Sequence, residues 1–77
     1  MTKREAEKTL RAIGMRLTKT EFGEYRVTFR RSVMPYAEQR ELHAYYTMNL
    51  DDAVDSGRQI AAAYHRVIRD IQSSFPT

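Results

Sequence analysis

The fold of this 77-residue chain is decided by residues 49–71, which read NLDDAVDSGRQIAAAYHRVIRDI. The apolar positions in this stretch recur at the spacing of one helical face. They are Leu50, Ala53, Val54, Gly57, Ile60, Ala61, Tyr64, Val67, Ile68 and Ile71. Asn49 is a preferred N-cap residue, and the acidic turn that follows it suits the helix dipole. We predict a helix over about 50–72, followed by a frayed tail over 73–77. A helix of this length with one apolar face requires a flat apolar partner.

A second helix is predicted at the start of the chain. Thr2 and Glu5 have the spacing of a capping box, in which each side chain satisfies a backbone amide of the other residue. Apolar residues then recur at helical spacing, at Ala6, Leu10 and Ile13. Gly14 follows, and glycine is the preferred residue for the left-handed position that ends a helix. We therefore predict a helix over about 3–13.

The apolar period changes to two after Gly14, which predicts strands. Apolar and polar residues alternate over about 15–20 and again over about 24–30. Gly23 lies between these segments and suits the positive φ of a tight turn, so we predict an antiparallel hairpin. A shorter alternating segment predicts a third strand over about 43–47, of which either face can be the buried one.

The segment 31–42 has no clear period. Pro35 is incompatible with a central strand, and residues 36–42 can form one or two helical turns, so we interpret the segment as a long irregular connection. Together the elements predict one α+β domain over residues 1–77: a helix, a three-stranded antiparallel sheet and a helix. We expect both helices to pack on one face of the sheet and the other face to remain open. Gly57 lies on the buried stripe of the last helix and predicts a close approach to the sheet.

Composition and spacing argue against catalysis and metal binding. The chain has no cysteine, three isolated glycines, and two histidines that are far apart, His43 and His65. Its one carboxylate cluster, Asp51, Asp52 and Asp55, suits the start of a helix. These residues supply neither a nucleophile with a base, nor a zinc site, nor a phosphate loop. We expect a non-enzymatic protein with no metal, no cofactor and no small-molecule substrate.

The same composition argues against a membrane protein. No stretch of the sequence has the long apolar run of a membrane helix. Residues 1–5 lead into mixed charge rather than into the apolar core of a signal peptide. We expect a soluble, cytoplasmic protein without a membrane partner.

The charge of the chain is unevenly distributed. The formal net charge is +3, but residues 1–31 hold nine Lys or Arg against four Glu, and residues 32–77 hold four Arg against six acidic residues. A basic N-terminal half can attract an anionic partner. The alternative interpretation is that the charge serves solubility and pairing within the domain.

The open face of the predicted sheet is the candidate site. Arg16, Arg26 and Arg30 alternate with the apolar positions of the hairpin and therefore share this face, together with one member of the Tyr45 and Tyr46 pair. Arginine can reach phosphate or guanine edges, and an aromatic ring can stack on a base. We interpret this face as a possible nucleic-acid contact, and its candidate residues are Arg16, Arg26, Arg30, Arg31 and Tyr45. The alternative is that long arginine side chains simply cover the exposed side of a small sheet.

A second hypothesis is a protein-interaction module that forms a homodimer through residues 33–46. Several apolar side chains have no evident place in a core of two layers, and a short third strand leaves an unpaired edge. The candidate interface residues are Val33, Met34, Tyr36 and Tyr45, and Leu42 and Phe75 are further apolar groups of this kind. The alternative is that residues 31–42 fold back and bury several of these side chains, and that the others are the isolated apolar residues found on any surface.

The predicted element order resembles that of double-stranded RNA-binding domains. In that family a basic cluster of the form KKxxAK opens the last helix, and a GPxH loop joins the first two strands. Here the last helix opens with LDDAVD at 50–55, and the first turn reads EFGE at 21–24. Both positions that would contact RNA are acidic, so the resemblance implies the topology but not the RNA-binding function.

A second resemblance covers about half of the chain. The segments GEYRVTF at 23–29, YYT at 45–47 and LDDAVDSGR at 50–58 are similar to those of small uncharacterised proteins from bacterial and phage genomes. This resemblance implies a bacterial or prophage cytoplasmic protein and carries no activity with it.

Overall fold

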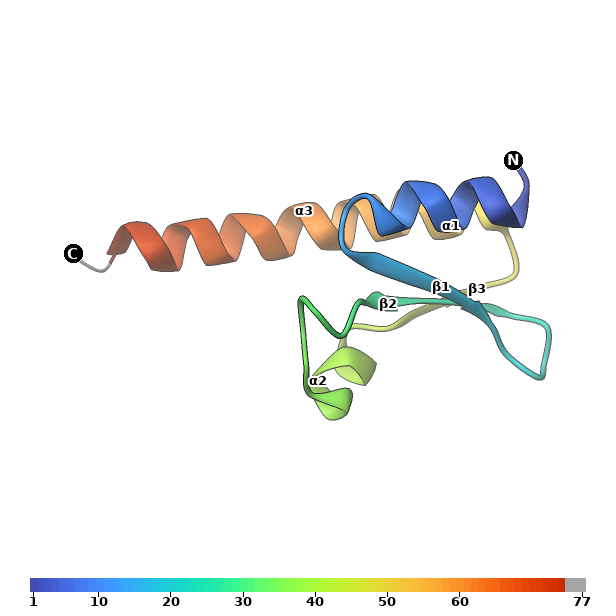
Figure 1. Ribbon diagram of the computed structural model, residues 1–77, viewed down its shortest axis with the longest axis horizontal. Helices are drawn as coiled ribbons and strands as arrows, with labels where there is room; N and C mark the ends of the chain where they lie inside the picture. Colours follow the sequence, from blue (N-terminus) through green and yellow to red (C-terminus); the bar gives the residue numbers. More distant parts are fainter. Residues whose placement is uncertain (75–77) are drawn as a thin grey trace.

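The structure is a computed structural model that describes residues 1–74, with side chains described through residue 69. The elements in chain order are α1 (Lys3–Arg11), β1 (Met15–Lys19), β2 (Tyr25–Phe29), α2 (Ala37–Leu42), β3 (Tyr45–Thr47) and α3 (Leu50–Ser74). The three strands form one antiparallel sheet in the order β1-β2-β3. α1 and α3 lie on one face of this sheet (Figure 1). The predicted α+β fold, with its helix, three-stranded sheet and helix, is confirmed.

The ends of the elements differ from the predicted bounds by a few residues. α1 ends at Arg11, because residues 12–14 form a turn in which Gly14 has a φ of 80°. β3 begins at Tyr45, because the Ala44 amide instead donates to the Glu41 carbonyl in a turn. α3 runs to Ser74, two residues beyond its predicted end, and the remainder of the predicted tail lies outside the described residues.

The core lies between the two helices and the sheet. Its largest fully buried side chains come from α1, β1, β2 and α3, and they are Leu10, Met15, Val27, Phe29 and Val54. α3 approaches this core closely at Gly57, where an added Cβ would lie 3.2 Å from Val27 Cγ1 and would collide with the Leu10 side chain. The predicted close approach at Gly57 is therefore confirmed, and it involves α1 as well as the sheet.

The helix caps follow the sequence pattern. The Thr2 hydroxyl accepts from the Glu5 amide at 3.2 Å. The Asn49 carboxamide oxygen accepts from the amides of Asp51 and Asp52 at 2.8 and 3.1 Å. These bonds satisfy amides that the first turn of a helix leaves without a partner.

The segment predicted as an irregular connection contains the short helix α2, which lies on the side of the sheet opposite α1 and α3 (Figure 1). Arg40 holds the start of this segment by donating to the carbonyls of Met34 and Pro35, at 2.9 and 2.7 Å. α2 packs near β2, and Thr28 in that strand is only 3% exposed although it faces away from the core. The second face of the sheet is therefore not fully open, which corrects the prediction for its β2 portion.

α3 is longer than the sheet that it covers, and its C-terminal half projects beyond the domain (Figure 1). Among the described residues, no helix is both long enough and apolar enough to cross a membrane.

Candidate nucleic-acid interface

β1 is an edge strand with one side unpaired. Its register with β2 places Arg16 opposite Thr28 and Leu17 opposite Val27. Just beyond the two ends of β1, the Thr20 amide donates to the Glu24 carbonyl and the Arg30 amide donates to the Gly14 carbonyl. Because ladder bonds fall on alternate residues, the even-numbered residues of β1 form the hydrogen bonds to β2. In an antiparallel ladder the alternate residues direct their amides and carbonyls to the other side. Those residues are Met15, Leu17 and Lys19.

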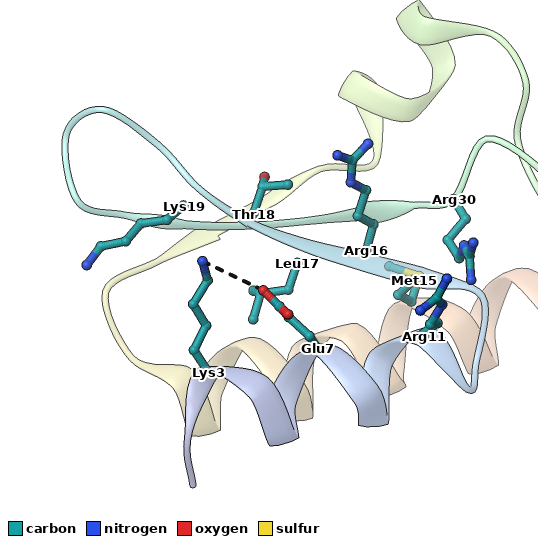
Figure 2. A pocket seen from close by; sticks show the side chains of 9 residues that line it. All are labelled: Lys3, Glu7, Arg11, Met15, Arg16, Leu17, Thr18, Lys19 and Arg30. Atoms are coloured by element: carbon teal, nitrogen blue, oxygen red, sulfur yellow. Dashed lines mark ion pairs between the residues drawn. The ribbon is translucent and has the colours of Figure 1, made fainter.

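A groove with a volume of about 500 Å³ follows this free edge. It lies between α1 and β1 and is lined by Lys3, Glu7, Arg11, Met15, Arg16, Leu17, Thr18, Lys19 and Arg30. Figure 2 shows that Lys3 and Lys19 lie at one end of the groove, and that Arg11 and Arg30 lie at the other. The chain reversal at Gly14 runs β1 back along α1, and this reversal brings the two basic pairs to the two ends.

The groove is strongly basic. Five of its lining residues are Lys or Arg and one is acidic, an excess of four positive charges, whereas the whole chain has a net charge of +3. The remainder of the chain therefore has a net charge of −1. The single acid, Glu7, is paired with Lys3 at 3.7 Å, with both side chains about half exposed (Figure 2), and an exposed pair of this kind is weak.

The other four cations of the groove have no carboxylate within ion-pair distance among the described side chains. Arg11, Arg16 and Lys19 are exposed, and Arg30 is half-buried. Lys19 lies 5.7 Å from the centre of the Tyr25 ring, a cation–π contact that leaves the charge uncompensated. These four side chains therefore place four positive charges without an ion-pair partner around one groove.

Arg26, a predicted member of the site, is neutralised inside the domain. Its guanidinium group forms an ion pair with Glu41 of α2 and donates to the Tyr46 hydroxyl at 3.2 Å. The Tyr46 hydroxyl in turn donates to Glu41. The hydrogen bond from Tyr46, followed by that from Arg26, lowers the pKa of the Glu41 carboxyl below its usual 4.5. The same contact with Glu41 raises the pKa of Arg26. We therefore remove Arg26 from the candidate site.

The prediction that Tyr45 belongs to the open face is wrong. Tyr45 is opposite Val27 and faces α3, whereas Tyr46 is opposite Arg26 on the other face. The Tyr45 hydroxyl donates to Asp52 Oδ2 at 2.7 Å, and this bond is the main cause of the lowered pKa of Asp52. The five predicted strand residues did not reveal which face is buried, because both faces carry aromatic or small side chains.

Arg16 and Arg30 both line the groove, but Figure 2 shows that Arg16 points away from α1 whereas Arg30 points toward Arg11 on α1. Arg31 is exposed in the turn after β2 and does not line the groove. Sequence reasoning missed Lys3, Arg11 and Lys19. The only signal for them was the basic excess of residues 1–31.

Three of the four residues predicted for the protein interface pack or form hydrogen bonds within the domain. Met34 is 6% exposed within the core cluster, and Val33 packs against that cluster, so the structure agrees with the alternative in which this segment folds back and buries these two side chains. Tyr45 is bonded to α3, and Tyr36 alone of the four predicted residues is widely exposed, at 69%. Leu42 is also exposed, whereas Phe75 lies outside the described residues.

Comparisons of the chain with protein-family models, with curated proteins and with solved structures gave no match. The functional argument therefore depends on the geometry and charge of the groove.

Proposed function

We propose that this chain is a small, non-enzymatic protein that binds nucleic acid by contacting the phosphate backbone in the basic groove along β1. The observation that carries the proposal is the set of four cations, Arg11, Arg16, Lys19 and Arg30, which share one groove without a carboxylate partner among the described side chains. The proposal includes a cytoplasmic location, where a nucleic acid would be available.

The chemistry of the groove suits phosphate contacts. Arginine can donate two parallel hydrogen bonds to a phosphate, and the Thr18 hydroxyl in the same lining is a further donor. Each neutralised phosphate releases condensed counterions, so binding of this kind weakens steeply as salt increases. The four cations repel one another in the free protein, and an anionic ligand bound between them would lower this repulsion.

The same lining argues for weak sequence preference. None of its nine described residues is aromatic, and the predicted stacking residue, Tyr45, bonds to Asp52 of α3 and does not line the groove. Contacts to phosphate position a protein on nucleic acid, whereas contacts to bases supply specificity. We therefore expect binding that depends on charge and changes little with base sequence.

The proposal is tested by fluorescence anisotropy of labelled single-stranded and duplex oligonucleotides at about 50 and 200 mM salt. The test variant is Arg16→Ala with Arg30→Ala. The control is Arg58→Ala with Arg66→Ala, which removes the same charge from exposed positions on α3. We expect the groove variant to bind at least about tenfold more weakly at low salt, and the control to change affinity by less than about twofold. Absence of binding at low salt, or equal loss in both variants, would overturn the proposal.

A further inference from the structure

The free edge of β1 presents a second kind of binding group in addition to its cations. Met15, Leu17 and Lys19 direct their backbone amides and carbonyls away from β2, and no described residue bonds to them. Unpaired edge groups of this kind are a template for another strand. Five residues of β1 form an edge about 16 Å long, which is enough for a short added strand.

The shape of the groove suits an extended chain. α1 forms one wall and the edge of β1 forms the other, with basic side chains at both ends (Figure 2). A groove between a helix and an edge strand is the arrangement in which peptides add to a sheet by main-chain hydrogen bonds. The side chains of an added strand alternate between the two faces, so one set would meet Arg16 and the other would meet α1, where Arg30 lies beside Arg11 (Figure 2).

We propose that the β1 edge binds an extended acidic segment of a partner protein as a fourth strand of the sheet. Charge identifies this occupant, because the groove has an excess of four positive charges and carboxylates on alternate residues would pair with them. A second copy of this chain is disfavoured, because pairing two β1 edges would bring ten cations together. The acidic strand would contact the same cations as the nucleic acid of the proposed function. The inference depends on a different observation, the unpaired backbone groups of β1.

A nucleic acid would satisfy only part of this edge. Its phosphates accept hydrogen bonds from the cations, but they offer no donor to the edge carbonyls. A peptide backbone supplies both donors and acceptors. Acidic strand and nucleic acid therefore compete for the groove, and only the strand depends on the geometry of the β1 backbone.

The test uses a labelled peptide of about seven residues with alternating Glu and Val, the length that a five-residue edge requires with one residue at each end. Lys19→Pro is compared with Lys19→Gln. Both variants remove the charge, but only proline removes the outward amide, and it leaves the ladder to β2 intact because Lys19 does not contribute to that ladder. We expect peptide affinity about fivefold lower in Lys19→Pro than in Lys19→Gln, the effect of one lost hydrogen bond. Oligonucleotide affinity should be equal in the two variants.

A second measurement protects against a folding defect in Lys19→Pro. The same peptide, N-methylated at alternate residues, is titrated against the unaltered protein, and we expect its binding to be lost. No binding of the unmodified peptide, or equal binding of both peptides, would overturn the inference. Oligonucleotide binding without peptide binding overturns only this inference. Peptide binding without oligonucleotide binding overturns only the proposed function.

Discussion

The two edges of the sheet differ in how their polar groups are satisfied. At the β3 edge, Tyr45 donates to Asp52, and Tyr46 links Glu41 to Arg26. At the β1 edge, five cations face a groove with a single carboxylate. β3 has three residues, whereas β1 has five and therefore presents a longer free edge.

The difference separates structural charge from charge that is available to a partner. The tyrosine and carboxylate contacts at β3 join that strand to α2 and α3, so they are explained by the fold. The cations at β1 make no such contact among the described residues, and the edge beside them has no strand partner there. The β1 edge is therefore where an anionic partner should bind.

Phe29→Ala should have the largest effect, because it removes the scaffold that both edges share. Phe29 lies in the central strand and is 1% exposed, and its ring centre lies 4.8 Å from that of Tyr64. We expect the free energy of unfolding to fall by about 3–5 kcal/mol in a urea titration, most of the stability of a domain this small. Phe22→Ala is the control, since Phe22 is 78% exposed in the hairpin turn and should change stability by about 0.5 kcal/mol or less. Equal effects of the two variants would contradict the assigned core.

A comparison of Arg16→Ala with Arg26→Ala sharpens the contrast between free and paired cations. Both residues lie on the same face of adjacent strands, but only Arg26 is bonded to a carboxylate. We expect Arg16→Ala to weaken oligonucleotide binding about fivefold at low salt, and Arg26→Ala to change it by about twofold or less. Anisotropy titrations check this expectation, and a greater loss in Arg26→Ala would return that residue to the site.

The β3 edge should give the smallest effect, a dependence of stability on acidic pH. Folding lowers the pKa values of Glu41 and Asp52, so their contribution is fully present above the unfolded values of 4.5 and 3.8. It is lost as the pH falls through the lower folded values. Urea midpoints measured from neutral to acidic pH should therefore fall less steeply in Glu41→Gln than in the unaltered protein.

Glu38→Gln is the matched control for this pH series, because it removes the same charge from α2 without removing the bond to Tyr46. We expect it to retain the unaltered pH profile. If Glu38→Gln flattened the profile as much as Glu41→Gln, the cause would be the net charge of α2 and not the contact with Tyr46.

Local patterns predicted the fold well because each element has its own signal. The 3.6-residue period of α3, the alternation of β1 and β2, and the N-caps at Thr2 and Asn49 all agree with the structure. The site was predicted only in part. Alternation along the strands predicted Arg16 and Arg30 as site residues, but Arg11 joins them through the reversal at Gly14, which is a matter of tertiary packing.

The errors also have a physical origin. Pairing of Arg26 with Glu41 depends on α2 folding back across β2, and a six-residue helix has too weak a local signal to predict that position. Tyr45 and Tyr46 are adjacent in a three-residue strand, so alternation has too few positions to distinguish their faces. Met34 appeared to lack a place in the core because the return of this loop could not be predicted from residues 31–36.

The most direct test of the account is a map of amide chemical shifts during titration with a short single-stranded oligonucleotide at low salt. The account predicts that the largest changes fall on residues 15–19, Arg11 and Arg30, and that residues 45–47 change little. Largest changes on β3 and α2, or no changes anywhere, would contradict the claim that the β1 edge is the binding surface.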